Sequence, residues 1–188
     1  IPKSLEECRY YRNNDSIDGG TFDNCANLKT VMFEDGTTEI AEGLFAGCTG
    51  IEQITIPDTV TVIESGAFGG CINLKEIVVP DNVTEIQSSA FEYCSSLKTV
   101  KLSENLERIG VYAFGDCDVL KSIKIPDSVL DIDGAAFAEC KELSDVVLSK
   151  NLKTMGWQVF GNDNKLTEIE IPKSLEECRY YRNNDSID

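Results

Sequence analysis

The strongest constraint on this chain is a repeat of 23 residues that runs through most of its 188 residues. The segment at residues 56–77 returns at residues 79–100, and further copies begin at Leu102, Ile125, Leu148 and Ile171. An earlier copy begins at Phe33. Self-similarity at a fixed period of this length predicts a solenoid, in which each coil stacks on the next and contacts only its neighbours.

Apolar side chains keep the register of this repeat without a gap. One ladder consists of phenylalanines at Phe22, Phe45, Phe68, Phe91, Phe114, Phe137 and Phe160. A second consists of cysteines at Cys25, Cys48, Cys71, Cys94, Cys117 and Cys140, and its next position is Asp163. Two further ladders hold Leu, Ile or Val. Because equivalent side chains stack along a solenoid, we expect these ladders to form its core.

The apolar spacing within one coil predicts its local structure. In the coil at residues 74–97, the alternation at 77–79 predicts a strand, which Pro80 ends because proline has no backbone N–H to donate. A second extended segment follows at 83–86. Spacings of three and four at 90–97 predict a short helical or 3₁₀ turn.

This pattern, LxxIxIPxxVxxIxxxAFxxCxx, resembles the BspA-like class of leucine-rich repeats and covers nearly the whole chain. The resemblance implies an α/β-type solenoid that is mostly β. It implies a curved, right-handed leucine-rich-repeat coil with a parallel sheet on its concave side. It also implies a secreted or cell-surface role in recognition or adhesion, with a protein or glycan as ligand, but the family shares a scaffold and not a site.

The register divides the single solenoid at residues 1–188 into three parts. Residues 1–30 form a variant coil with nine extra residues, placed at about 9–20. Residues 31–170 hold the regular coils. Residues 171–188 repeat residues 1–18 without one change, so we expect a higher-order unit of 170 residues, of which this chain is a fragment.

Composition and charge exclude several functions. The formal charge of −16 argues against nucleic acid and anionic membrane surfaces as partners. No run of 18 apolar residues is present, so we expect no membrane insertion. No signal peptide is visible in the sequence either, and the expected extracellular or cell-surface location rests on the family resemblance.

Chemistry at a catalytic centre also finds no support. The chain contains no histidine, which removes the Ser/His/Asp and Cys/His sets, and it contains no glycine-rich phosphate loop. We therefore expect neither an enzyme nor a cofactor.

The cysteine ladder favours a buried column of free thiols that pack as small hydrophobes. Disulfides between neighbouring coils and a zinc site are the alternatives, although neither CxxC nor histidine is present. An acidic column at Asp35, Asp58, Asp81, Glu104 and Asp127 has two interpretations. It suits turn formation, and carboxylates in register could also bridge calcium.

The nine-residue insertion differs from the rest of the chain in being rich in arginine and tyrosine, which are enriched at interface hot spots. This suggests a partner-binding or junction loop at Arg9, Tyr10, Tyr11 and Arg12, with its second copy at Arg179, Tyr180, Tyr181 and Arg182. An inert bulge is the alternative. Three acceptor motifs for N-glycosylation lie at Asn14, Asn82 and Asn184.

Two functions remain open at this stage. One is an extracellular recognition or adhesion module, which would use the insertion or the exposed rows beside the first strand. These rows are Thr30, Gln53, Glu76, Thr99, Ser122, Asp145 and Glu168, and Met32, Thr55, Val78, Lys101, Lys124, Val147 and Glu170. The alternative is a fibre, in which further copies of the chain assemble end to end.

Overall fold

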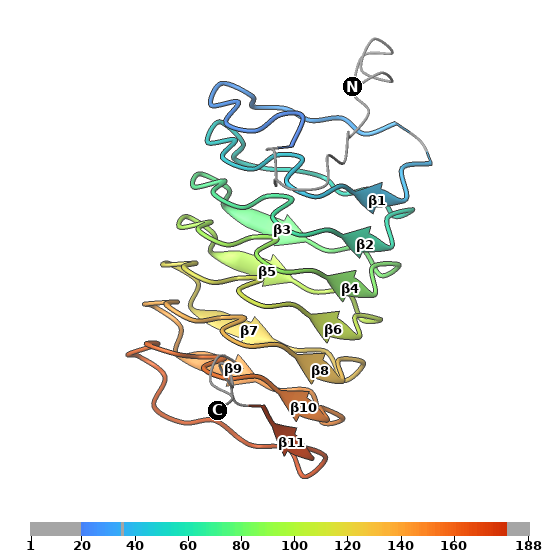
Figure 1. Cartoon of the computed structure of the whole chain (residues 1–188). Helices are drawn as coiled ribbons and strands as arrows, with labels where there is room; N and C mark the ends of the chain where they lie inside the picture. The colour runs from blue at the N-terminus through green and yellow to red at the C-terminus, as the bar shows by residue number, and fades with distance from the viewer. Residues whose placement is uncertain (1–19, 35, 180–188) are drawn as a thin grey trace, which may run out of the picture.

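The computed structural model describes residues 20–34 and 36–179, which form a stack of coils (Figure 1). Each strand is two or three residues long. In the described part the strands are β1 (Glu39–Ile40), β2 (Val62–Ile63), β3 (Glu76–Val78), β4 (Glu85–Ile86), β5 (Thr99–Lys101), β6 (Arg108–Ile109), β7 (Ser122–Lys124), β8 (Asp131–Ile132), β9 (Asp145–Val147), β10 (Thr154–Met155) and β11 (Glu177–Cys178).

All pairing between these strands is parallel and keeps the register of the repeat. The second extended segment of each coil forms a seven-stranded sheet in the order β1-β2-β4-β6-β8-β10-β11. Within it, Ile63 pairs with Ile86, and Ile86 pairs with Ile109. The first strands form two separate pairs, β3 with β5 and β7 with β9. The predicted parallel solenoid is confirmed, and its longest sheet comes from the second segment rather than from the first.

The third side of each coil is a hydrogen-bonded turn segment, not the predicted helical or 3₁₀ turn. No helix is present within residues 20–34 and 36–179. Alternate N–H groups donate to the next coil, as from Gly66 to Ser88 at 2.9 Å and from Phe68 to Ala90 at 2.8 Å. A helix would direct every N–H group along its own axis, so this ladder between coils replaces it.

The turn segment is built on two residues per coil with positive φ. The first column is Gly43, Gly66, Ser89, Tyr112, Ala135 and Gln158, and the second is Asn24, Gly47, Gly70, Tyr93, Asp116, Glu139 and Asn162. Glycine adopts this left-handed conformation without steric cost, whereas each other residue costs roughly 1–2 kcal/mol. The cost at residues such as Tyr112 is offset by the hydrogen bonds that the ladder forms with both neighbouring coils.

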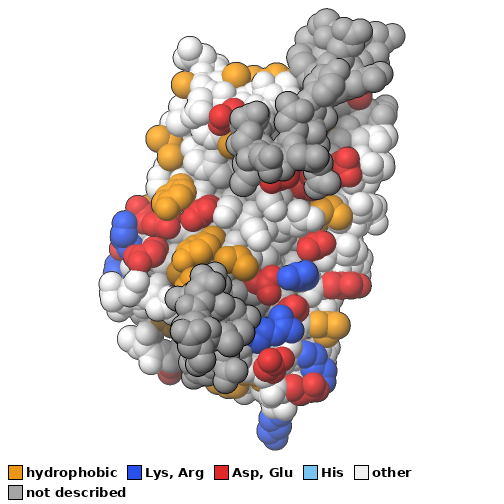
Figure 2. Space-filling model, in the orientation of Figure 1, with side chains coloured by type: hydrophobic (Ala, Val, Ile, Leu, Met, Phe, Trp, Pro, Cys, Tyr) orange, Lys and Arg blue, Asp and Glu red, His pale blue; other side chains and the backbone are white. Residues whose placement is uncertain are grey.

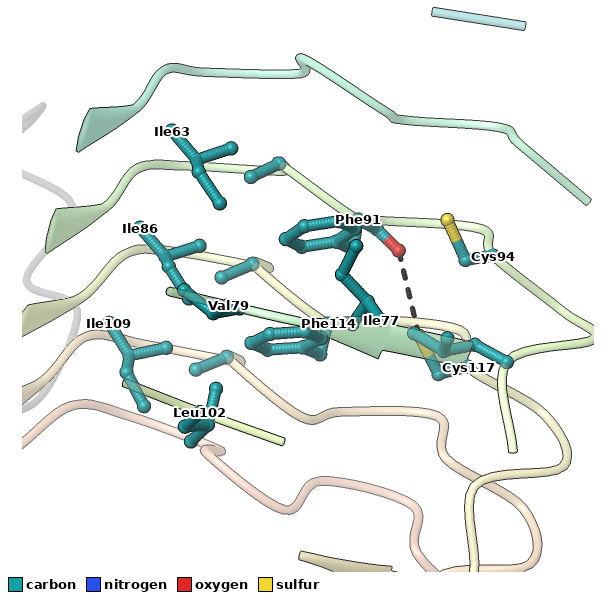
Figure 3. Close-up of a cluster of buried hydrophobic side chains, with 14 of the residues drawn as sticks. Ile63, Ile77, Val79, Ile86, Phe91, Cys94, Leu102, Ile109, Phe114 and Cys117 are labelled. Atoms are coloured by element: carbon teal, nitrogen blue, oxygen red, sulfur yellow. Dashed lines mark hydrogen bonds between the residues drawn. The ribbon is translucent and has the colours of Figure 1, made fainter. Parts of the chain in front are cut away.

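Stacked phenylalanine rings fill the centre of the solenoid. Neighbouring rings of the ladder from Phe22 to Phe160 lie 5.2–5.7 Å apart between centroids, with interplanar angles of 4–15°. The five interior rings are buried, as predicted, and Phe22 and Phe160 are half-buried at the two ends. Figure 3 shows Phe91 and Phe114 packed beside Ile63, Ile86 and Ile109 from the seven-stranded sheet.

The cysteine ladder lies beside the phenylalanines, and its sulfur atoms are reduced. Each buried thiol donates to the carbonyl oxygen of the phenylalanine in the preceding coil, as from Cys94 to Phe68 at 3.3 Å and from Cys117 to Phe91 at 3.5 Å (Figure 3). Cys48, Cys71, Cys94, Cys117 and Cys140 are buried free thiols. The prediction is wrong at Cys25, which is free but exposed, because it lies in the first described coil and not between two coils.

The predicted division of the chain is tested only in part of its length. The regular coils lie within the described residues, whereas the insertion at about 9–20 lies outside them apart from Gly20. The 170-residue unit stays a prediction.

Replacing Phe91 by alanine should lower the free energy of unfolding by about 3–5 kcal/mol, because the cavity would interrupt a continuous stack of rings. Phe160→Ala is the matched control and should cost less, since that ring is already half-buried. Urea unfolding followed by circular dichroism measures both. Equal costs at the two positions would contradict the assigned core.

Alkylation of the native chain should modify Cys25 and Cys178, which are exposed, well before the five buried thiols. Burial raises the pKa of Cys71 to about 12, so little reactive thiolate forms there at neutral pH. Peptide mass mapping measures the order of modification. In denaturant without a reductant all six ladder cysteines should react, and a ladder cysteine that stays unmodified would refute the free-thiol assignment.

Candidate functional site

The exposed rows beside the first strands form one candidate surface, here called the first-strand face. All fourteen side chains predicted for these two rows are exposed, with Met32 at 73%, Val78 at 56% and Val147 at 52% among them. Three hollows of about 330–430 Å³ open on this face, and no aromatic side chain lines them. The face is therefore accessible but shallow and mostly polar, and it offers few anchoring groups.

A second surface lies over the turn segments and has a more specific composition. Three aromatic and three acidic residues line one hollow of about 340 Å³. We call it the aromatic–acidic surface, and it consists of Tyr93, Tyr112, Trp157, Glu92, Asp116 and Glu139. In Figure 2, hydrophobic side chains lie among acidic ones on one side of the visible face, while acidic and basic side chains alternate over the seven-stranded sheet.

Two rings of this surface meet across an intervening coil. Tyr112 and Trp157 lie edge to face, with ring centroids 5.9 Å apart and an interplanar angle of 79°. The coil between them carries Gly134 and Ala135, and the indole of Trp157 occupies the space that a side chain at Gly134 would need. The two small residues therefore permit an aromatic contact between coils that are not neighbours.

Crowded carboxylates set the electrostatics of the aromatic–acidic surface. Burial raises the pKa of Asp116, and the nearby carboxylates of Glu139 and Asp118 raise it further. Glu92, followed by Asp116, raises the pKa of the Tyr93 phenol. Lys141 compensates in part through an ion pair with Asp118 at 2.9 Å. A cation placed in the hollow would relieve this repulsion.

Sequence reasoning missed this surface because its residues come from different coils. The signal that could have located it is the register itself, since Tyr93, Asp116 and Glu139 stand in one column at intervals of 23 residues. Tyr112 belongs to the other positive-φ column. Placing the exposed aromatic residues on the coil diagram would have brought them together.

Of the predicted Arg/Tyr loop, the structure describes one residue, Arg179. Its Nη1 atom lies 3.5 Å from Asp131 Oδ2 and 3.9 Å from Asp133 Oδ1, so it forms ion pairs across two coils. The other loop residues, Arg9, Tyr10, Tyr11, Arg12, Tyr180, Tyr181 and Arg182, lie outside the described residues. The binding role of this loop stays a prediction.

The predicted glycosylation sites are also only partly described. Asn82 is exposed, and its Nδ2 atom donates to the backbone oxygen of Asp58 at 2.5 Å. Asn14 and Asn184 lie outside the described part. Glycosylation at all three positions remains a prediction.

The acidic column forms turn hydrogen bonds. Asp81 Oδ1 accepts from the N–H of Glu104 at 3.0 Å, and Asp127 Oδ1 accepts in the same way from Lys150. These bonds connect each turn to the next coil and agree with the turn interpretation. Among residues 20–34 and 36–179, no group of three or more acidic or cysteine side chains is placed to hold a metal ion.

Asp163 occupies the cysteine position of the last full coil and is buried. Its Oδ1 atom accepts from the N–H of Cys140 at 2.8 Å, while Oδ2 has no hydrogen-bond partner among the described groups. Burial raises the pKa of this carboxyl from the ordinary value of 3.8 to about 7. The carboxyl thus takes the place of a thiol but carries a titrating proton in the core.

Comparison with known proteins identifies the scaffold. The sequence profile described as the BspA type leucine rich repeat region, in six copies, matches residues 2–117 and 61–187. The fold is that of a leucine-rich-repeat solenoid, and the chain belongs to the BspA-type leucine-rich-repeat family. None of the curated proteins matches the chain significantly.

Solved bacterial structures share this fold. A leucine-rich repeat protein from Bacteroides ovatus is 36% identical, with a TM-score of 0.72 over 80% of this chain and 40% of that protein. The T. pallidum leucine-rich repeat protein is 31% identical, with a TM-score of 0.73 over 78% of this chain and 69% of that protein. A leucine rich cell surface protein from Faecalibacterium prausnitzii is 30% identical, with a TM-score of 0.52 over 84% of this chain and 51% of that protein.

These comparisons define the general class of function. Leucine-rich-repeat solenoids of this family are non-enzymatic scaffolds that bind proteins, and no catalytic family matches the chain. Within the described residues, no helix is long and apolar enough to cross a membrane.

Replacing Asp163 by asparagine should change how stability depends on pH. The folded state holds the proton between the ordinary pKa of 3.8 and about 7, whereas the unfolded state releases it. The free energy of unfolding contributed by Asp163 should therefore decrease as the pH rises through this interval. Asp163→Asn keeps the acceptor for Cys140 and removes the titration.

Urea unfolding of both chains at several pH values measures the difference. The variant should gain stability relative to the original chain as the pH rises from 4 to 8, in a window that follows from the shifted pKa. A difference that stays constant across this range would show that Asp163 does not titrate in the folded state.

Proposed function

We propose that this chain is a recognition module exposed outside the cell or on its surface, which binds a protein partner through the aromatic–acidic surface. The observation that carries this proposal is the gathering of Tyr93, Tyr112 and Trp157 with carboxylates in one hollow. Tyr and Trp dominate interface hot spots, because they bury a large area and lose little conformational entropy.

The electrostatics favour a partner segment that carries arginine or lysine. A guanidinium group in the hollow would pair with Asp116 and Glu139, whose proximity raises the pKa of Asp116. It could also stack on the exposed ring of Tyr93, where cation–π attraction adds to the ion pairs. The first-strand face is a weaker candidate, because its hollows have no aromatic lining.

An extracellular or cell-surface location is part of the same proposal. It follows from the family, and the printed description of the F. prausnitzii relative as a cell surface protein supports it. Adhesion is the role that such a location and a protein-binding surface would serve together. Detection of the native protein on intact source cells by an antibody tests the location, and a signal that requires cell lysis would contradict it.

End-to-end assembly into a fibre is the second candidate function. One observation favours it, namely the identity of residues 1–18 and 171–188. In this case the solenoid would be a structural unit, and the partner would be another copy of the chain.

Trp157 offers a direct test of the recognition surface, because it is the only tryptophan in the chain. Titration with a tryptophan-free, arginine-rich peptide should change its fluorescence in a saturable way. Asp116→Asn with Glu139→Gln should weaken binding about tenfold, since the charge-assisted contacts would be lost. Lowering the pH from 7 to 5 should also weaken binding, because the raised pKa of Asp116 favours early protonation.

Val78→Ser is the matched control, since it changes an exposed residue on the first-strand face. This variant should bind the peptide as the original chain does. An unchanged tryptophan signal, or equal binding by the charge-removed variant, would overturn the proposed recognition surface.

A further inference from the structure

The last described segment, residues 171–179, docks on the coil that precedes it. Its strand β11 pairs with β10, with Glu177 opposite Thr154 and Cys178 opposite Met155. The N–H of Arg179 donates to Met155 at 2.8 Å. In addition, the hydroxyl of Ser174 lies 2.7 Å from the backbone oxygen of Lys150 and 2.8 Å from that of Leu152.

Side chains make this docking specific. Leu175 packs against the hydrophobic core, and Glu176 forms an ion pair with Lys153 at 2.5 Å. Arg179 reaches over the intervening coil to Asp131 and Asp133. The segment therefore combines strand pairing, an apolar anchor and charges of both signs, and each group meets a complementary group on the solenoid.

The same sequence occurs at the other end of the chain. The docking residues Ser174, Leu175, Glu176, Glu177, Cys178 and Arg179 correspond to Ser4, Leu5, Glu6, Glu7, Cys8 and Arg9. A surface that binds the first set presents the same contacts to the second. We call this surface the acceptor surface, and it consists of β10 with Lys150, Leu152, Lys153, Asp131 and Asp133.

We propose that the acceptor surface binds residues 1–9 of a second copy of this chain, so that copies join head to tail. The tethered segment 171–179 competes for the same surface and has the advantage of an intramolecular concentration, which is in the millimolar range for short linkers. A single chain therefore closes its own acceptor surface, and joining begins when that segment is displaced. This inference extends the fibre alternative and is independent of the aromatic–acidic surface.

Selective damage to the tethered segment tests the proposal in the full chain. Leu175→Asp with Arg179→Glu removes the apolar anchor and reverses the charge that faces Asp131 and Asp133, while residues 1–18 stay intact. Sedimentation velocity at roughly 1–100 µM should show dimers and larger species for this variant. The original chain should stay monomeric over the same range.

The matched control carries the same two changes in both copies, with Leu5→Asp and Arg9→Glu added. This chain should stay monomeric, because neither segment can occupy the acceptor surface. A synthetic peptide of residues 1–18 should also dissolve the assemblies of the first variant. Circular dichroism checks that the coils remain folded in every chain.

Two results would overturn the proposal. The first is a monomeric Leu175→Asp, Arg179→Glu chain with intact coils. The second is equal association by the control with changes in both copies, which would show non-specific contact through the exposed end of the core. Neither result bears on the peptide titration of Trp157, so the two proposals fail separately.

Discussion

The structure depends on one set of hydrogen bonds, those that join the turn segments of neighbouring coils at the phenylalanine ladder. The N–H of Phe45, Phe68, Phe91, Phe114 and Phe137 each donates to the coil that follows, at 2.8–2.9 Å. These bonds fix the coil spacing at which the rings stack 5.2–5.7 Å apart. The buried thiols join the same network, since they donate to phenylalanine carbonyl oxygens of the preceding coil.

The regular core leaves the surface of each coil free to carry different side chains, and this is where function can reside. The two positive-φ columns are an example, because their backbone shape is constant while their residues change from glycine to tyrosine, aspartate and glutamate. Glycine would adopt that shape without steric cost, so Tyr93, Tyr112, Asp116 and Glu139 accept backbone strain at those positions. Their gathering around one hollow supports a role for these side chains beyond folding.

Much of the fold could be predicted from the sequence, because a core of identical ladders requires its register to be visible. The burial of Phe91, the free thiol at Cys94 and the two extended segments all follow from spacing. The turn segment did not, since positive φ is apparent at Gly66 but concealed where the equivalent residue is Tyr112. The aromatic–acidic surface was missed for a related reason: Tyr112 and Trp157 meet only because Gly134 leaves room between them.

Amide hydrogen exchange of the native chain tests the central claim most directly, because it reports on the hydrogen bonds between coils one residue at a time. The amides of Phe68, Phe91 and Phe114 should exchange slowest, and protection should decline toward the coils at both ends of the described stack. Exchange at these three amides as fast as in an unfolded peptide would contradict the account, because the coils would then be held together by something other than this ladder.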